Sequence, residues 1–273
     1  MKIAWSNDIH LNFVDTAVAG KFCARILKTE SAALLIGGDI AEASDLVTWL
    51  RFLEENLPLP VYFVLGNHDY YGSSIASVRD QVRGLDSERL HWLPEAGVVP
   101  LTNHACLVGH GGWGDSRHGD FLYSNLMLND YFAIDELRAA GKEGEPFMGF
   151  HLSKAPLKKP LEALGDDAAR TLEPFLVDAL SRFEEVIVLT HVSPFPESCL
   201  YRGKISDPEW LPDFTCKAVG DLLRREVAAH PDCQVTVLCG HTHGGGKTQV
   251  LPNLQVLTGA ARYGKPDFQI LDI

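Results

Sequence analysis

Five apolar runs, each ending in polar residues, organise the chain. The clearest run spans 61–65, is rich in β-branched and aromatic residues, and leads directly into Gly66-Asn67-His68-Asp69. Such a run is typical of a strand that is buried on both faces. Similar runs occupy 2–7, 33–36, 186–190 and 235–239. The pattern therefore predicts five core strands, each followed by side chains that can bind metal or move protons.

Segments with helical spacing separate these strands. Val18, Phe22 and Ile26 recur at intervals of four, and an apolar stripe recurs in the same way within 167–183. Further helices are predicted at about 44–55 and 215–229, and further strands at 90–93, 105–108, 247–251, 254–257 and 268–271. Strands that alternate with helices indicate a largely parallel sheet with right-handed crossovers. The last three strands are expected to be antiparallel and to complete a second sheet.

Two segments interrupt the alternation of strands and helices. Residues 115–165 are mixed in character and are interpreted as an insertion beside a single domain that spans 1–273. Residues 195–214 form a proline-containing loop, and loops of this length inside a compact domain usually have a function. Arg117 and His118 of the first segment, and Tyr201 and Arg202 of the second, are candidates for substrate contact. A solvated loop is the alternative for all four.

The polar side chains that follow the strands are carboxylates, imidazoles and an amide, all of which can bind a metal ion. In a parallel sheet the carboxyl ends of the strands lie at one edge, where ligands bind. Taken singly, each block could also be a polar turn or a helix cap. Five blocks in order make chance unlikely as an explanation and predict one shared site. The residues concerned are Asp8, His10, Asp39, Asn67, His68, Asp69, His191, His241 and His243.

Charge and cysteine usage limit the classes of function. The net charge is −12, and basic residues form no run longer than a doublet. Binding of long nucleic acids depends on clustered lysine and arginine, so such substrates are disfavoured. The six cysteines are scattered without a CxxC spacing, which favours reduced thiols and a cytoplasmic location. No apolar run approaches the roughly 18 residues of a membrane span.

The five blocks together resemble the motif set of the calcineurin-like metallophosphoesterase superfamily, in its bacterial-type cytoplasmic form. They read Asp8-x-His10, Gly38-Asp39, Gly66-Asn67-His68-Asp69, His191 and Gly240-His241-x-His243. The resemblance covers residues 8 to 243 and shows no departure in these blocks. It implies an α/β fold of four αββα layers, in which two facing mixed β-sheets are flanked by helices.

The resemblance also implies which side chains bind each metal ion. Two divalent transition-metal ions are expected, with manganese first and iron, zinc, nickel or cobalt as alternatives, because imidazole, carboxylate and amide ligands suit these ions. The first ion is expected on Asp8, His10 and His243, and the second on Asn67, His191 and His241. Asp39 is expected to bridge them.

The activity that the resemblance implies is hydrolysis of phosphomonoesters or phosphodiesters. A hydroxide that bridges the two metals is expected to attack phosphorus. His68 is expected to assist the leaving group, with Asp69 orienting its ring. Small-molecule or protein phosphoesters are the expected substrates. A non-catalytic metal-binding scaffold and a nuclease remain the alternatives.

Overall fold

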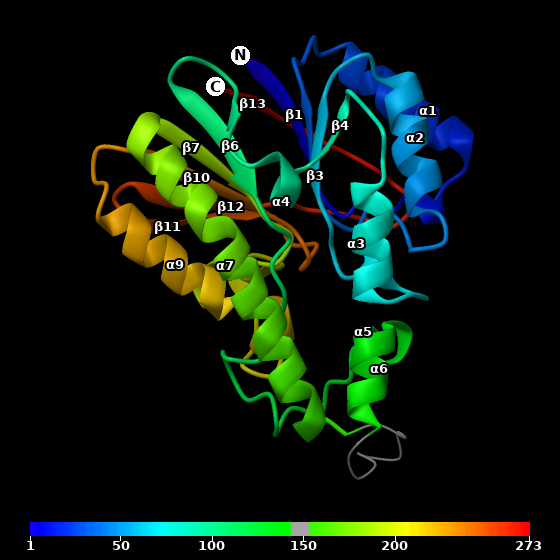
Figure 1. Ribbon diagram of the computed structural model, residues 1–273, viewed down its shortest axis with the longest axis vertical. Coiled ribbons are helices and arrows are strands. Elements are labelled where there is room, and N and C mark those ends of the chain that lie inside the picture. The colour runs from blue at the N-terminus through cyan, green and yellow to red at the C-terminus, as the bar shows by residue number, and fades with distance from the viewer. Residues whose placement is uncertain (143–152) are drawn as a thin grey trace.

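The computed structural model describes residues 1–142 and 153–273 of the chain. Within these residues two mixed β-sheets face each other, and helices cover the outer side of each sheet (Figure 1). The predicted four-layer αββα sandwich is therefore confirmed. Alternating strands and helices produce this arrangement because each crossover helix must bury its apolar stripe on a sheet.

The first sheet contains the amino-terminal strands. Its order is β13 (Gln269–Asp272), β1 (Lys2–Ser6), β2 (Leu34–Gly37), β3 (Val61–Val64) and β4 (Leu90–Trp92). Strands β1 to β4 are parallel, and α1 (Thr16–Leu27), α2 (Leu46–Asn56) and α3 (Ile75–Arg83) connect or follow them. The prediction for 268–271 is corrected here, because β13 pairs antiparallel with β1 and not with the second sheet. Strand periodicity gives no information about which edge a terminal strand joins.

The second sheet contains the remaining long strands. Its order is β11 (Gly246–Leu251), β12 (Leu254–Thr258), β10 (Gln234–Cys239), β7 (Glu185–Leu189), β6 (Ala105–Gly109) and β5 (Val99–Pro100). Helices α7 (Lys158–Arg182) and α9 (Lys217–Ala228) cover its outer side (Figure 1). Strand β11 is antiparallel to β12 as predicted, but β12 is parallel to β10 and so differs from the prediction.

The interface between the sheets explains why the strands are apolar on both faces. Trp5, Leu35, Val64, Leu107 and Leu189 form one buried cluster that is drawn from both sheets. Two further clusters lie between each sheet and its helices. This packing fixes the two sheets relative to each other, so the carboxyl ends of β1, β2, β3, β7 and β10 converge.

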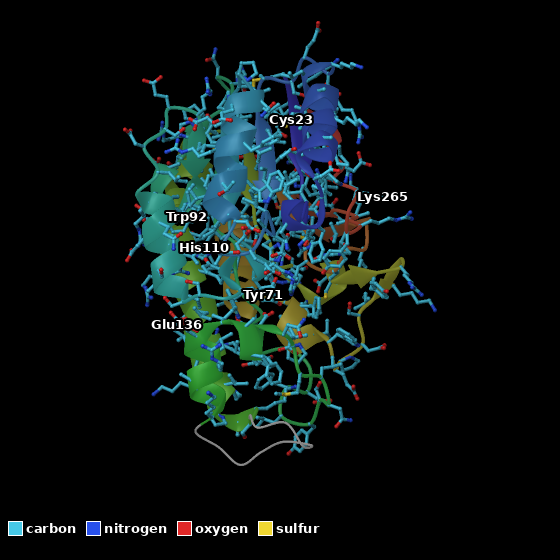
Figure 2. All side chains as sticks on the ribbon, turned by 90° about the vertical axis from the view of Figure 1, so that its right-hand side faces the viewer. Cys23, Tyr71, Trp92, His110, Glu136 and Lys265 are labelled. Carbon is cyan, nitrogen blue, oxygen red and sulfur yellow. The ribbon has the colours of Figure 1, made fainter. Side chains whose placement is uncertain are left out.

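The predicted insertion contains α5 (Asp130–Ala133) and α6 (Asp135–Gly141), and it runs into the start of α7. Residues 143–152 of this segment lie outside the described residues. The Glu136 carboxylate accepts a hydrogen bond from the backbone N–H of Ile75, at 2.9 Å, and so attaches α6 to the start of α3 (Figure 2). Helix α7 begins nine residues earlier than predicted, because its first turns carry no continuous apolar stripe.

The segment at 195–214 is more ordered than a loop. It contains a short hairpin of β8 (Leu200–Tyr201) and β9 (Lys204–Ile205), followed by α8 (Leu211–Phe214). The two turn residues, Arg202 and Gly203, have φ values of 50° and 77°, as a tight hairpin turn requires. Strands of two residues are too short to show a periodicity. Across residues 1–142 and 153–273, no helix has the length and apolar character needed to cross a membrane.

Small connecting elements complete the described chain. Helix α4 (Leu93–Ala96) follows β4 and lies between the two sheets (Figure 1). Single turns of 3-10 helix follow β1 and β3, at Leu11–Phe13 and His68–Tyr70. These turns reverse the chain at the edge where the strands end, so they hold the polar residues of the motifs close to the sheet.

Candidate metal centre

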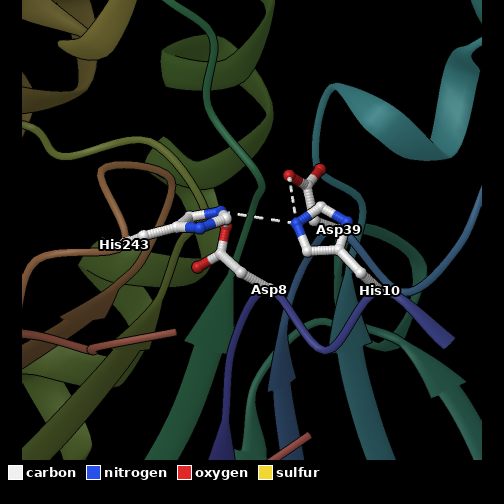
Figure 3. A group of neighbouring side chains, drawn as sticks. All are labelled: Asp8, His10, Asp39 and His243. Atoms are coloured by element: carbon white, nitrogen blue, oxygen red, sulfur yellow. Dashed lines mark hydrogen bonds and ion pairs between the residues drawn. The ribbon is translucent and has the colours of Figure 1, made fainter. Parts of the chain in front are cut away.

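The structure brings the polar residues at the strand ends together in two groups of potential metal ligands. One group is Asp8, His10, Asp39 and His243 (Figure 3), and the other combines Asp39 with His191 and His241. Within each group the ligand atoms lie within 4.8 Å of one another. We call these the first and second groups.

Asp39 belongs to both groups through different oxygen atoms. Its Oδ2 lies 3.7 Å from Nε2 of His10, and its Oδ1 lies 3.5 Å from Nε2 of His191. The backbone N–H of His68 also donates to Oδ1, at 2.9 Å, which fixes the carboxylate. A carboxylate that presents one oxygen to each group is suited to bridge two cations.

The backbone at the ligands is unusual. Positive φ angles occur at Asp8 (48°), His10 (43°), Asp39 (51°), His241 (67°) and His243 (56°). These five are among eight residues other than glycine that have positive φ in the described chain. The left-handed region costs free energy for residues with a Cβ, and such conformations concentrate at functional sites. The strain therefore marks this edge as a site.

Glycines allow the two halves of the site to approach. A Cβ on Gly66 would lie 2.2 Å from Oδ1 of Asp39 and 2.8 Å from Cε1 of His191. Gly38 has φ of 84°, and a Cβ there would lie 2.8 Å from Nδ1 of His191. These two glycines of the sequence motifs are thus required by close packing around the candidate ligands.

The imidazoles of the second group are oriented by backbone carbonyls. Nδ1 of His191 donates to the carbonyl of Gly37, at 2.9 Å, and Nε2 of His241 donates to the carbonyl of Asp213, at 3.2 Å. A carbonyl only accepts, so the other nitrogen of each ring is free of a proton. These free nitrogens lie 3.1 Å apart, and Oδ1 of Asn67 lies 3.0 Å from Nε2 of His191. Asn67 therefore joins the second group.

Burial sets the charge of the site. It lowers the pKa of His10 to about 3, and it lowers the pKa of His191 and His241 as well. Burial, followed by the nearby charge of Asp8, raises the pKa of Asp39 well above its usual value. Neutral imidazoles are the form that binds metal, and crowded buried carboxylates are stabilised by cations. The residues present therefore fit a pair of divalent ions.

His68 lies beside His10 and Asp39 but is held in a different way. Its ring stacks on Tyr71 with centroids 4.3 Å apart, and it contacts the edge of His10 at 4.7 Å. Its Nδ1 has no hydrogen-bond partner among the described residues. Burial lowers its pKa to about 4. The neutral ring keeps one N–H for donation.

Asp69 has a different role from the predicted one. Its Oδ1 accepts from the backbone N–H groups of Ile40, at 2.8 Å, and Ala41, at 2.9 Å, while Oδ2 accepts from Gly66, at 2.8 Å. Both oxygens are therefore used to tie the chain after β2 to the chain after β3. This corrects the expectation that Asp69 orients His68. Tyr71 holds that ring instead.

A cavity of about 710 Å³ opens beside His241 and His243. Two of the four predicted substrate residues, Tyr201 and Arg202, line it. Trp210 and Tyr263 form further parts of its wall, and the Tyr263 ring lies 4.4 Å from that of His10. The cavity therefore leads from solvent to His241 and His243 of the candidate metal centre.

The other two predicted substrate residues are placed elsewhere. Arg117 forms ion pairs with Asp115, at 3.0 Å, and with Asp166, at 2.7 Å. His118 shares a hydrogen bond of 3.1 Å with Thr215. Neither is among the described residues that line the cavity beside the metal centre. Their positions therefore do not support the predicted substrate contact.

Sequence reasoning missed four residues around the site. Tyr71 contacts the ring of His68, and the other three, Asp130, Asp213 and Tyr263, contact the amide or the rings of predicted ligands. Tyr71 and Asp130 are joined by a hydrogen bond of 2.5 Å across 59 positions of the chain. None stands in a motif, and contact across such a distance leaves no local signal in a single sequence.

Comparison with known proteins agrees with this geometry. Residues 1–245 match the family model described as calcineurin-like phosphoesterase. A phosphopantetheinyl hydrolase from Mycobacterium tuberculosis is 15% identical with a TM-score of 0.63, covering 95% of this chain and 89% of the other. A dimetal phosphatase from Danio rerio is 12% identical with a TM-score of 0.56, covering 95% and 87%. At these identities the solved structures support the fold alone. No curated protein matches the chain.

Proposed function

Because the chain belongs to the calcineurin-like phosphoesterase family, we propose that it hydrolyses phosphomonoesters or phosphodiesters with two divalent transition-metal ions. One observation carries this proposal: two groups of ligand-type side chains share the Asp39 carboxylate. Asp8, His10 and His243 would hold one ion, and Asn67, His191 and His241 the other. The oxygen and nitrogen donors suit manganese, and the described ligand groups contain no thiolate.

The bound ions would neutralise phosphoryl charge and lower the pKa of a bound water, so that hydroxide is available at neutral pH. The chain itself supplies orientation and a proton donor. Asp39 holds both halves of the site in register, and the stack on Tyr71 keeps the His68 ring beside them. The N–H of His68 would donate to the leaving oxygen as negative charge develops there.

The cavity would receive the organic part of the substrate. Four of the eleven large hydrophobic side chains that are exposed in the described residues line it: Tyr201, Ile205, Trp210 and Tyr263. Clustered exposed apolar groups indicate a binding surface. Arg202 and Lys204 add positive charge to the wall, against one acidic side chain there, Asp207. A small organic phosphoester with a ring or apolar body and a further negative charge fits this composition best.

The long-nucleic-acid alternative has little support in the charge of the chain, which is −12. The cytoplasmic location predicted above is also kept as part of the proposal. All six cysteines are buried and free, as expected for a protein in a reducing compartment.

Metal analysis and ester hydrolysis together test the proposal. The manganese-loaded protein should carry two ions per chain and hydrolyse 4-nitrophenyl phosphate or bis(4-nitrophenyl) phosphate faster than it degrades duplex DNA. Less than one ion per chain would refute the metal centre. Two ions without hydrolysis of either ester or of cyclic nucleotides would favour the scaffold alternative, and rapid cleavage of plasmid DNA would favour the nuclease.

The proposed substrate surface needs its own variant. Trp210→Ala should raise the KM for bis(4-nitrophenyl) phosphate several-fold, because an exposed aromatic wall is lost, and should change kcat less. Lys21→Ala, an exposed change on α1, is the matched control. An unchanged KM in Trp210→Ala would place the organic part of the substrate elsewhere.

A further inference from the structure

A buried carboxylate on the insertion contacts the amide of a predicted metal ligand. Asp130, at the start of α5, is 5% exposed. Its Oδ1 accepts from Nδ2 of Asn67, at 2.8 Å, and from the hydroxyl of Tyr71, at 2.5 Å. Since a carboxylate accepts and cannot donate, it fixes which end of the amide faces it. Oδ1 of Asn67 is thereby turned toward His191 and the second group.

The next residue of the same helix reaches a second ligand. The hydroxyl of Tyr131 donates to the carboxylate of Asp213, and both side chains are buried. The carbonyl of Asp213 accepts from Nε2 of His241, which leaves Nδ1 of that ring for a metal. Two consecutive residues of one short helix therefore lead to two of the three ligands that belong to the second group alone.

Packing alone does not account for a carboxylate at position 130. Burying a carboxylate costs free energy unless hydrogen bonds compensate, and an apolar residue would fill the same space at less cost. What Asp130 contributes is a hydrogen-bond acceptor, which sets the orientation of the Asn67 amide. If it were removed, the Asn67 amide could rotate and present its NH₂ group, which repels a cation, to the second group.

We propose that Asp130 and Tyr131 are positioning residues through which the insertion controls occupancy of the second metal. This rests on the proposed function, because it requires two metals in the site. Asp130 acts by fixing the Asn67 amide, and Tyr131 acts by holding Asp213 against His241. Asp130 and Tyr131 make no hydrogen bond or ion pair with Asp8, His10 or His243 in the described residues, so the first ion should keep most of its affinity.

The proposal can be tested without measuring activity by titrating the metal-free chain with manganese. Calorimetry measures the affinity for each equivalent, and electron paramagnetic resonance shows whether the bound ions are coupled. In the wild type two equivalents should bind and give the spectrum of a coupled pair. In Asp130→Ala the second equivalent should bind about 10- to 100-fold more weakly, the usual cost of losing a partner of a ligand. The spectrum should then be that of an isolated ion at one equivalent.

The control for damage to the insertion is Asp135→Ala. Asp135 lies on α6 next to α5, its side chain is 49% exposed, and its contact is an ion pair with Arg138. This variant should bind both equivalents as the wild type does. Asp130→Asn keeps an oxygen that can accept from Asn67 but loses the charge, so its effect should be smaller than that of Asp130→Ala. Tyr131→Phe should weaken the second equivalent only a few-fold.

Three results would overturn the proposal. The first is a folded Asp130→Ala chain that binds both equivalents with wild-type affinity. The second is an equal weakening in Asp135→Ala, which would mean that the insertion acts through its fold alone. In either case ester hydrolysis by the wild type would leave the proposed function standing. The third is failure of the wild type to bind two equivalents, which would remove the proposed function as well.

Discussion

The two ligand groups are held in place by different means. Left-handed φ is common to both groups, at Asp8, His10 and His243 in the first and at His241 in the second. In the first group, however, Nδ1 of His10 has no hydrogen-bond partner among the described residues. In the second group partners orient the ligands: a carbonyl holds each of His191 and His241, and Asp130 holds the Asn67 amide.

The groups also differ in access to solvent. The side chain of His243 is 21% exposed and faces the cavity, whereas His191 is 1% exposed. A partly exposed ligand whose ring has no backbone carbonyl behind it can dissociate with the loss of fewer contacts. A buried ligand that is tied to a partner must break those contacts as well. The two metals are therefore expected to differ in lability, although their ligands are of the same chemical types.

Asp39→Asn should have the largest effect, because it removes the carboxylate that the two groups share. A metal that polarises phosphate supplies several kcal/mol of transition-state stabilisation. Loss of both metal ions from this variant should therefore lower kcat roughly a thousandfold or more. Metal analysis and the rate with 4-nitrophenyl phosphate measure this. Retention of two ions and of the wild-type rate would show that the groups do not depend on a common bridge.

His68→Asn should separate chemistry from metal binding in both groups. His68 is not a member of either group, so two ions should remain bound. Loss of a proton donor typically lowers kcat by about 10²- to 10⁴-fold. The loss should be smaller for nitrophenyl esters, whose leaving group scarcely needs a proton. Loss of one ion would instead identify His68 as a ligand, and a change of less than tenfold on an alkyl ester would exclude the catalytic role.

Chelation should reveal the difference in lability directly. Under a dilute chelator, one manganese should leave roughly tenfold faster than the other, because the first group has an exposed ligand and fewer partners. His243→Ala should abolish the fast phase, and His241→Ala the slow one. Release in a single phase from the wild type would contradict the contrast between the groups.

Tyr71→Phe should have the smallest effect on rate. It keeps the ring that stacks on His68 but removes the hydroxyl that donates to Asp130. A net hydrogen bond is worth about 1 kcal/mol, so a loss of roughly fivefold in kcat is expected, with both metals bound. Tyr71→Ala, which also removes the stack, should lose more. Equal losses in the two variants would show that the stack does not hold His68.

The sequence predicted the parts of the site that follow directly from strand ends. Asp8, Asp39 and His191 stand immediately after apolar runs, and parallel pairing carries them to one edge of the fold. The order of the strands and helices was likewise predictable from periodicity. The edge joined by β13 was not, because an alternating strand pairs equally well with either sheet.

The surroundings of the site could not be predicted from the sequence in the same way. Asp69 stands between a histidine and a tyrosine and looks like part of the chemistry, yet its oxygens bind backbone N–H groups from two loops. Asp130 stands in a segment without clear pattern, yet it contacts Asn67. Both roles depend on which chain segments meet, and that is decided by tertiary packing.

The left-handed ligands have a consequence for how such a protein would change over generations. A position that forces a side chain into strained backbone is one where glycine relieves the folded chain, at the expense of metal binding. His243→Gly should therefore leave the metal-free protein about 1 kcal/mol more stable than His243→Ala, which thermal unfolding would show. A lineage released from selection for catalysis would drift toward glycine at these positions.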